Sequence, residues 1–563
     1  MNDKKRMDNS TPDKEKKIKK IERIVLSVLM SAVVAAGAFV AGWYGRWGAL
    51  GKNKQALLEA IDTLKENYYK DIDEAAFYES LYEAFKLDDY SSFYTAEELK
   101  KIEEESEGQN FDAGFSVYAE ESHLVIYDIK EGSSAEKAET EGRKLEEGMY
   151  FYKFGRTVKD WDEDDKDDDE KTDWSKITAE DYFAFVATLK ADEEYVVLCG
   201  NSEEEADVYT VKNDKKGAGI SLMREYDPMR IYRVIGNSSA DHAGLKRGMY
   251  ILKYGESEEE MTSGFLQDFQ QFINELKPTV DETTKEKQWI FYMQCSFDKE
   301  DKEAPATQII MKPYQASYCY YRDSKTSYRI WLEDDKMQPV ETKEPIEELN
   351  DDTAYIALMR FTGNAAEEFK TCLELMTKYH RNNLILDLRG NGGGYMKVFA
   401  EIAGYLLKDA APGSRVVTAK FRDGSSVSYS IGSNNYNNYF DQNSHIYILA
   451  DEKTASASEC LIGALYDYGT IRYGDIFLHE DAAGVARTFG KGIMQTYYDI
   501  AGGNSLKITS AEVFWPKSGK SIHGVGVTAK GDGAQAIRSS LLPDENDSFL
   551  QEMIERIQRV TTE

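Results

Sequence analysis

The stretch Thr454-Ala455-Ser456-Ala457-Ser458-Glu459 decides the fold, together with a glycine cluster upstream of it. An apolar run at 446–450 leads into this turn, and a second apolar run at 384–388 leads into residues 389–394, Arg-Gly-Asn-Gly-Gly-Gly. Apolar runs of this length that end in small-residue turns indicate buried strands followed by tight loops. Loops at the carboxyl ends of strands are the usual position of a site in an α/β sheet, so we expect an α/β fold with its site at these two loops.

The serine turn is followed downstream by Gly490-Lys491-Gly492, a lone lysine between two glycines. A serine hydroxyl is a weak nucleophile until a base takes its proton, and a lysine can be that base only if burial lowers its pKa toward neutrality. The small residues beside Ser456 would leave a neighbouring amide free to bind an oxyanion. Taken alone, such short motifs are more often ordinary turns, so the reading depends on the rest of the chain.

The three segments, in this order, resemble the carboxy-terminal processing (tail-specific) peptidases, a serine–lysine family of extracytoplasmic endopeptidases. The family pattern consists of an LDLRxNxGG loop, a SASE turn and a TFGKGxxQ segment, and all three are present. The resemblance covers roughly residues 57–545, because segments 66–73, 87–94, 355–361 and 522–527 also look like parts of such peptidases.

The resemblance implies a crotonase-like α/β peptidase core at 314–545 that works by acyl transfer. Ser456 would attack the peptide carbonyl, with neutral Lys491 as general base and then general acid. Gln495, about one helical turn beyond Lys491, would orient the lysine. Ser458 is an alternative nucleophile, although the family pattern favours the first serine of the turn.

The same resemblance implies an oxyanion site built from backbone amides, namely the amide of Ala457 and a glycine amide from Gly393 or Gly394. One departure from the family lies between serine and lysine, where about ten surplus residues fall around 476–487. A surface loop absorbs such a length at small entropic cost, and we expect one here. Neither the motifs nor the resemblance implies a metal or another cofactor.

The middle of the chain repeats itself. Residues 125–135, VIYDIKEGSSA, recur as RIYRVIGNSSA at 230–240, and the GMY…FG pattern of 148–155 recurs as GMY…YG at 248–255. A period of about 100 residues is a domain size rather than a solenoid unit. Each copy resembles a PDZ domain, which predicts two PDZ-like β-rich domains at 108–213 and 214–313.

A PDZ groove holds the end of a peptide by strand addition and by capture of its carboxylate in a loop of amides. Gly114 with Phe115 in the first copy, and Gly219 with Ile220 in the second, would supply that loop and its apolar pocket. The family commonly carries one such domain, so the pair leaves open which copy binds substrate. The second copy directly precedes the core and is the favoured one.

Composition limits the classes of function. A chain of 563 residues holds several domains, and its net charge of −32 argues against a nucleic acid partner because phosphate would be repelled. The five cysteines show no CxxC spacing, which predicts buried free thiols rather than a disulfide framework or a zinc site. Residues 160–170 carry seven aspartates and two glutamates. A calcium loop would also need a glycine and a final glutamate at fixed positions, so a solvated loop is the favoured reading.

The ends of the chain predict a membrane protein. Residues 24–44 form an uncharged apolar run long enough to cross a bilayer, and residues 1–23 carry nine Lys/Arg against five acids. The positive-inside rule then predicts a basic cytoplasmic tail, a single transmembrane anchor and an extracytoplasmic remainder. A cleaved signal peptide is the competing reading. A helical region is expected at 52–107, before the PDZ-like domains, and a helix or tail at 546–563.

The sequence therefore predicts a membrane-anchored serine endopeptidase that cleaves proteins recognised by their free C-terminal tails. Its expected partners are those protein or peptide substrates and the membrane, and homo-oligomer formation is left open. The alternative is a catalytically inactive, membrane-tethered PDZ scaffold or regulator. A core with acyl-thioester chemistry is a further class, since the crotonase-like fold serves both, but two PDZ-like copies argue against it.

Overall fold

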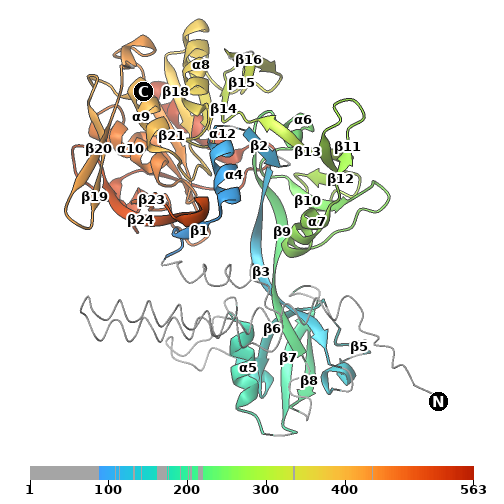
Figure 1. Ribbon diagram of the computed structural model, residues 1–563. Helices are drawn as coiled ribbons and strands as arrows, with labels where there is room; N and C mark the ends of the chain where they lie inside the picture. Colours follow the sequence, from blue (N-terminus) through green and yellow to red (C-terminus); the bar gives the residue numbers. More distant parts are fainter. Residues whose placement is uncertain are drawn as a thin grey trace.

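A computed structural model describes most of residues 88–562 (Figure 1). The residues outside the description are 1–87, 108, 113–114, 131–132, 141, 147, 162–173, 175–176, 191, 201, 203–205, 214–219, 334–335, 434 and 563. The predicted basic tail and anchor at 1–44, and nearly all of the acidic insert at 160–170, therefore lie outside the described residues. No helix of the described part combines the length and the apolar character that crossing a bilayer requires.

An eight-stranded sheet forms the centre of the carboxy-terminal half. Its strands are β14 (Cys319–Arg322), β15 (Ser327–Glu333), β16 (Lys336–Thr342), β17 (Thr353–Leu358), β18 (Asn383–Asp387), β21 (Ile446–Ala450), β22 (Ile476–Glu480) and β25 (Gln535–Arg538). Their order is β16-β15-β14-β17-β18-β21-β22-β25, and neighbours from β17 to β25 run parallel. A parallel run of strands joined through helices is the α/β architecture that the sequence predicts.

Helices cover both faces of the parallel strands, which explains their nearly continuous apolar sequences. Leu384 and Leu386 pack in the larger core on one face, whereas Ile385 packs on the other face with α12 (Ser548–Thr562). The larger core includes residues of three helices: α8 (Ala365–Lys378), α9 (Met396–Leu406) and α10 (Ala457–Asp467). Within the segment 546–563, for which a helix or tail is expected, the structure has α12.

The two strands that the sequence places before the glycine and serine loops are confirmed as β18 and β21. They are parallel neighbours, with Asp387 opposite Leu449. Their carboxyl ends therefore open at the same edge of the sheet, and the loops 388–395 and 451–456 leave it side by side.

A second, smaller sheet lies beside this edge. Its strands are β1 (Ser92–Tyr94), β19 (Arg415–Phe421), β20 (Ser426–Ser430), β23 (Ile493–Asp499) and β24 (Ser505–Phe514). β24 pairs antiparallel with β1, β19 and β23. Through β1 the described N-terminal segment joins the carboxy-terminal half of the chain. The region predicted as helical at 52–107 therefore contains a strand before its helix α4 (Ala96–Ser106), and residues 52–87 lie outside the description.

The insert at 476–487, expected as a surface loop, begins with a buried strand instead. β22 lies between β21 and β25 in the main sheet, and Ile476, Phe477 and Leu478 are buried. His479 is also buried, with Nδ1 at 3.0 Å from Glu452 and Nε2 at 2.9 Å from the carbonyl oxygen of Ser539. The loop prediction was wrong for 476–480 because an apolar run there fills a place in the sheet, and the exposed residues of the insert beyond it are 482–485 and 487.

The middle of the chain forms two β-rich modules on one ten-stranded sheet (Figure 1). The strands are β2 (Gln109–Asp112), β3 (Phe115–Ile129), β6 (Tyr150–Gly155), β7 (Glu194–Gly200), β8 (Asp207–Lys212), β9 (Ile220–Val234), β10 (Tyr250–Gly255), β11 (Thr279–Val280), β12 (Lys287–Ser296) and β13 (Ala306–Gln315). Smaller elements are β4 (Glu139–Thr140), β5 (Arg143–Lys144), α5 (Ala179–Ala187), α6 (Ser239–His242), α7 (Leu266–Glu275) and, in the carboxy-terminal half, α11 (Ala529–Asp532). The order β2-β13-β12-β10-β9-β3-β6-β7-β8 runs through both modules.

Each module has its own hydrophobic core. The outer module is built around Ile126 and Tyr195, and the inner module, which contacts the peptidase-like half, around Ile231 and Phe291. We use these two names below.

The two modules exchange strands. β3 and β9 pair antiparallel along their length, from Phe115 opposite Val234 to Ile129 opposite Ile220. The first half of β3 thus pairs in the inner module, and the first half of β9 pairs in the outer one. Residues 115–119 and 220–224 occupy equivalent positions of the sequence repeat, so each fills the place that the other would take in a simple tandem. The modules therefore share strands and do not separate at the predicted boundary after residue 213.

Candidate active site

Ser456 stands at the turn between β21 and α10, in a backbone conformation that few residues adopt. Its φ is 58° and its ψ is −115°, and it is the residue immediately before the helix. A residue with a side chain at positive φ is strained, and such strain is concentrated at functional sites. The half-buried Ser456 is thus presented at the sheet edge where the two predicted loops meet.

Ser458, the alternative nucleophile, is placed differently. Its side chain is 0% exposed, and its hydroxyl donates a hydrogen bond of 2.9 Å to the carbonyl oxygen of Asn391. The amide of Ala455 donates to the same carbonyl at 3.0 Å. Ser458 therefore joins the serine turn to the glycine loop, and its hydroxyl is occupied in that role.

The carboxylate of Glu459 connects the serine turn to the lysine segment. One of its oxygens accepts hydrogen bonds from the amides of Ser456 and Lys491, each at 2.9 Å. The other oxygen accepts from the hydroxyl of Thr488 at 2.6 Å and from the amide of Gly490 at 2.8 Å. Both amides bind the same oxygen at 2.9 Å, so the backbone nitrogens of Ser456 and Lys491 lie no further apart than twice 2.9 Å. The predicted nucleophile and base are therefore brought together.

The surroundings of Lys491 lower the pKa of its amine. Burial is the main cause that lowers the pKa of this amine, and the nearby positive charge of Lys507 lowers it further. The carboxylates of Asp88 and Glu459 act in the opposite direction. A lowered pKa is what a lysine needs to accept a proton from a serine hydroxyl near neutral pH.

Gln495 lies on a strand rather than one helical turn beyond Lys491. It is the third residue of β23, next to an irregularity in the pairing with β24, and its side-chain amide donates to the hydroxyl of Thr509 at 3.1 Å. The helical expectation was wrong because residues 493–499 extend along β24 in a sheet. Gln495 and Lys491 nevertheless belong to one short segment beside the serine turn.

The glycine loop supplies amides near Ser456. Gly393 packs so closely that an added Cβ would lie 2.8 Å from both the amide nitrogen of Ala457 and the Cβ of Ser456. Its own amide donates to the side chain of Asn391 at 2.9 Å. Within the described chain, neither Gly394 nor Ala457 donates its amide to another residue. Of the two glycines that the sequence left open, Gly394 therefore keeps its amide available for an oxyanion.

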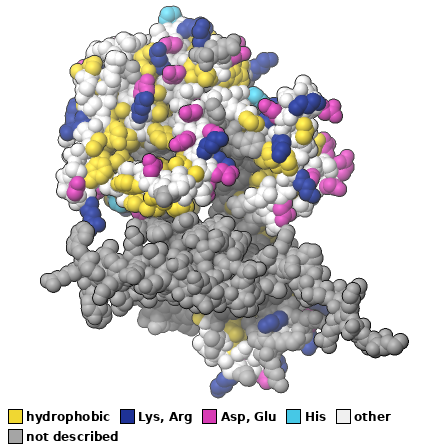
Figure 2. All heavy atoms as spheres, viewed as in Figure 1, with side chains coloured by type: hydrophobic (Ala, Val, Ile, Leu, Met, Phe, Trp, Pro, Cys, Tyr) yellow, Lys and Arg dark blue, Asp and Glu magenta, His cyan; other side chains and the backbone are white. Residues whose placement is uncertain are grey.

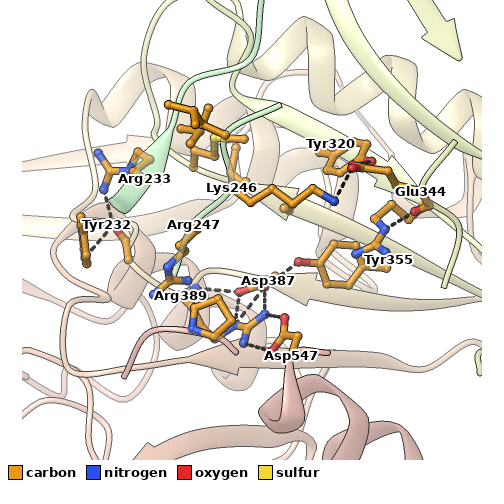
Figure 3. A pocket seen from close by; sticks show the side chains of 18 of the residues that line it. Tyr232, Arg233, Lys246, Arg247, Tyr320, Glu344, Tyr355, Asp387, Arg389 and Asp547 are labelled. Carbon is orange, nitrogen blue, oxygen red and sulfur yellow. Dashed lines mark hydrogen bonds and ion pairs between the residues drawn. The ribbon is translucent and has the colours of Figure 1, made fainter. Parts of the chain in front are cut away.

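The arginine of the glycine loop anchors it to the end of the chain. The buried Arg389 guanidinium pairs with Asp387 at 2.6 Å and with Asp547 at 2.7 Å, and Asp547 immediately precedes α12. Burial would lower the pKa of Arg389, but the two carboxylates hold it well above its usual value. The loop is thus fixed by a fully paired charge cluster (Figure 3).

The inner module touches the back of the same loop. The carbonyl oxygen of Gly390 accepts hydrogen bonds from Tyr232 at 3.3 Å and from the guanidinium of Arg233. Arg247 pairs at 3.1 Å with Asp451, whose other oxygen accepts the Gly390 amide at 2.9 Å. A cavity of about 270 Å³ lies between module and core, bordered by Tyr232, Arg233, Arg247 and Gly390 among others (Figure 3). The lining of this cavity includes neither Ser456 nor Lys491, so it is separate from the reacting groups.

Two residues that matter to this geometry were not predicted. Asn391 is fully buried, and its side-chain amide also donates to the carbonyl of Leu358 at 2.7 Å. Glu459 stands three residues after Ser456, which is the spacing of a capping box and the signal that could have found it. The hydrogen bonds between Glu459 and the lysine segment form only in the folded protein, so the local sequence could not predict them.

The predicted tail-binding residues are only partly described. Gly114 and Gly219 lie outside the described residues, whereas Phe115 and Ile220 begin β3 and β9. Because of the strand exchange, Phe115 pairs with Val234 in the inner module and Ile220 pairs with Ile129 in the outer one. Phe115 therefore begins a strand of the module next to the core, and Ile220 begins a strand in the outer module.

Apolar side chains gather on the surface where β1, β23 and β24 lie (Figure 2). The exposed ones on and just after β23 include Tyr497, Tyr498 and Ile500. β23 pairs on one side with β24, and among the described strands nothing pairs with its other side. An apolar strand edge beside Lys491 is the kind of surface that an extended peptide can contact.

Comparison with known proteins gives the same family for the core. Residues 352–530 match the family described as "Peptidase family S41". The chain is 30% identical over 178 residues to the carboxy-terminal processing protease CtpB of Bacillus subtilis, a match that covers 31% of this chain and 32% of that protein. It is 32% identical over 174 residues to the chloroplastic C-terminal processing peptidase of Tetradesmus obliquus, covering 31% and 33% of the two chains.

The chain spans about a third of the length of these curated relatives. Among solved structures, a photosystem II D1 C-terminal processing protease aligns over 91% of this chain and 92% of its own, with 14% identity and a TM-score of 0.36.

Proposed function

We propose, from the match of residues 352–530 to the family described as "Peptidase family S41", that the protein is a serine endopeptidase whose catalytic pair is Ser456 and Lys491. The observation that carries the proposal is the Glu459 carboxylate, which accepts the backbone amides of both residues on one oxygen. The strained backbone of Ser456 and the lowered pKa of Lys491 support it independently.

In the proposed reaction the hydroxyl of Ser456 attacks the peptide carbonyl while neutral Lys491 takes its proton. The oxyanion that forms is bound by the amides of Ala457 and Gly394, which donate to no other described residue. Protonated Lys491 then gives its proton to the leaving amine, and water, activated by the same lysine, hydrolyses the acyl-enzyme. Gln495, on the strand that Lys491 leads into, orients the lysine.

The test is peptide cleavage by the purified ectodomain, from residue 52 onward, and by its single variants. Ser456→Ala and Lys491→Ala are each expected to lower kcat by a factor of about 10³ or more. The two residues act as a unit, so removing either one removes nearly all of the catalysis that the pair provides. Ser458→Ala is the matched control and is expected to keep most of the activity. Cleavage by Ser456→Ala at the wild-type rate would reject the proposal and favour the inactive-scaffold alternative.

We further propose that the two modules are PDZ-like and deliver substrates by their C-terminal tails, and that the chain is anchored by 24–44 with its catalytic part outside the cytoplasm. The repeat and the charge pattern of the first 44 residues support this reading. The first half of β3 pairs in the inner module, so the loop with Gly114 and Phe115 is now the favoured one for tails that are to reach Ser456.

Tail recognition is tested with paired peptides that end in an apolar residue, one free and one amidated. Amidation is expected to slow cleavage mainly at low peptide concentration, because it weakens recruitment rather than bond breaking. Phe115→Asp should slow the free peptide more than Ile220→Asp does. If both peptides are cleaved equally fast, and neither Phe115→Asp nor Ile220→Asp changes the cleavage rate, the modules are spacers.

A further inference from the structure

The aromatic ring of Tyr90 faces the side chain of Lys491. The Nζ atom of the lysine lies 4.4 Å from the centre of the ring. Tyr90 comes from the N-terminal segment just before β1, at the opposite end of the described chain from the lysine. The family motifs all lie in the carboxy-terminal half of the chain. The proposed base Lys491 therefore has a neighbour, Tyr90, that is not part of those motifs.

This neighbour is held firmly. Ser91 is 1% exposed, and its hydroxyl accepts the amide of Thr509 on β24 at 3.2 Å. One oxygen of Asp88 accepts the amides of Tyr90 at 2.9 Å and of Ser91 at 2.7 Å, which fixes the turn. The following strand β1 then pairs with β24, with Ser92 opposite Lys507. The backbone that carries the Tyr90 ring is thus fixed on both sides of this residue.

The charged groups around Lys491 come from three elements. Lys507 on β24 repels the ammonium form, although its own amine donates to the hydroxyl of Tyr94 at 2.9 Å. Asp88 in the N-terminal turn and Glu459 in α10 attract the ammonium form. Burial is the largest cause of the lowered pKa. Exclusion of water is therefore the main cause that lowers the pKa of the amine, and the ring of Tyr90 faces that amine.

An aromatic ring acts on an amine in two opposite ways. Its bulk keeps water away, which disfavours the charged form, while its face attracts a cation, which favours that form. Replacing the ring by an aliphatic group of similar size would remove only the second effect. Replacing it by a small group would remove both and admit water.

We propose that Tyr90 is a positioning residue that covers the Lys491 amine, so that segment 88–94 of the N-terminal half completes the catalytic site. The proposal rests on the proposed function, since it assigns a partner to the same base. It predicts that the N-terminal segment is needed for catalysis and is more than a connection to the membrane.

The test is the pH dependence of kcat/KM for peptide cleavage, which reports the pKa of the base in the free enzyme. Tyr90→Ala is expected to raise the midpoint of the profile by about one unit, which lowers kcat/KM about tenfold at pH values below it. Tyr90→Phe should keep the wild-type midpoint because the ring faces the amine. Tyr90→Leu should keep it or lower it, since leucine excludes water without attracting a cation.

A matched control removes a ring from another lysine–tyrosine pair of the same core. The Nζ atom of Lys517 lies 3.6 Å from the centre of the Tyr468 ring, so Tyr468→Ala makes the same change away from the site and should leave the midpoint in place. Thermal unfolding of every variant identifies any that fail to fold, and the Leu and Phe variants retain most of the Tyr90 volume.

A wild-type midpoint in folded Tyr90→Ala would overturn the proposal, as would a rise in Tyr90→Leu equal to that in Tyr90→Ala. Failure of the proposed function looks different, because wild-type cleavage would then not depend on Ser456 at all.

Discussion

At the scale of single residues, Glu459 controls the relation between nucleophile and base. Four donors point at its two oxygens: the amides of Ser456, Gly490 and Lys491 and the hydroxyl of Thr488. Burial raises the pKa of the carboxyl group above its ordinary value, although these hydrogen bonds act in the opposite direction. A group that only accepts suits this place, since every neighbour donates.

We predict that Glu459→Gln lowers both stability and activity. The glutamine amide would direct its own N–H groups at amides that already donate, which leaves buried donors unpaired at a cost of about 1–3 kcal/mol each. A loss of about 3 kcal/mol in the free energy of unfolding and of at least about 10²-fold in kcat is expected, because the spacing of serine and lysine relaxes. Urea unfolding and peptide cleavage measure the two effects.

The exposed Glu555 serves as the control for that change, since its ion pair with Arg559 lies on the surface of α12. Glu555→Gln should cost less than about 1 kcal/mol and leave kcat unchanged. Wild-type cleavage by Glu459→Gln would show that the bridge between the two loops is dispensable.

At the scale of elements, the placement of α10 sets the position of Ser456 at its start. Gly463 in the middle of this helix packs directly on the indole ring of Trp515, which is 2% exposed. An added Cβ at Gly463 would lie 2.1 Å from atoms of that ring. No side chain fits there unless the helix or the ring moves, so the close approach requires glycine.

We predict that Gly463→Ala destabilises the protein although alanine is the better helix former by about 1 kcal/mol. Overpacking in a tight core typically costs about 1–3 kcal/mol, and the clash here places the expected loss near the upper value. Calorimetric unfolding measures it. Gly474→Ala, where an added Cβ meets nothing within 4 Å, should change stability by less than about 0.5 kcal/mol. Equal stabilities of the two variants would contradict the packing argument.

How far the elements could be predicted depends on what holds each of them. β18 and β21 were predictable because strands buried on both faces are apolar throughout. β22 has the same apolar character in Ile476-Phe477-Leu478. We predicted a loop there because the segment between serine and lysine is about ten residues longer than in the family pattern. β23 reads as Ile-Met-Gln-Thr-Tyr-Tyr-Asp, without a clear period, and its extended form comes from pairing with β24. The contact of Tyr90 with Lys491 has no local signal at all, because a second sheet brings distant segments together.

At the scale of the whole molecule, the strand exchange joins the two modules more tightly than a linker would. The sequence repeat predicts two similar modules, but it is silent on which copy of a strand fills which module, since the two copies have almost the same pattern. The exchange becomes visible only in the pairing of β3 with β9.

We predict that cysteine pairs distinguish the exchanged arrangement from a simple tandem. In the exchanged form Asp128 lies opposite Ser221. In a simple tandem it would lie opposite Ser116, the equivalent position of the first repeat. Opposite residues on antiparallel strands have Cβ atoms about 4.5–5.5 Å apart, close to what a disulfide requires. Mild oxidation should therefore cross-link Asp128→Cys with Ser221→Cys and leave Asp128→Cys with Ser116→Cys reduced, as read by mass after proteolysis. The opposite pattern would establish the simple tandem.

The strand exchange also affects how the chain folds during synthesis, because the strands that pair in the finished sheet are made at different times. Residues 115–119 leave the ribosome more than a hundred residues before 229–234, where their partners in the finished sheet lie. During that interval the only complementary strand available to them is their own 125–129, and nearby segments close sooner than distant ones. A nascent chain therefore first makes the local hairpin and must open it again once the second repeat has emerged. Slower translation should favour the premature hairpin. The speed of synthesis, as well as the sequence, therefore selects between the local hairpin and the exchanged pairing, whose strands have nearly the same sequence pattern.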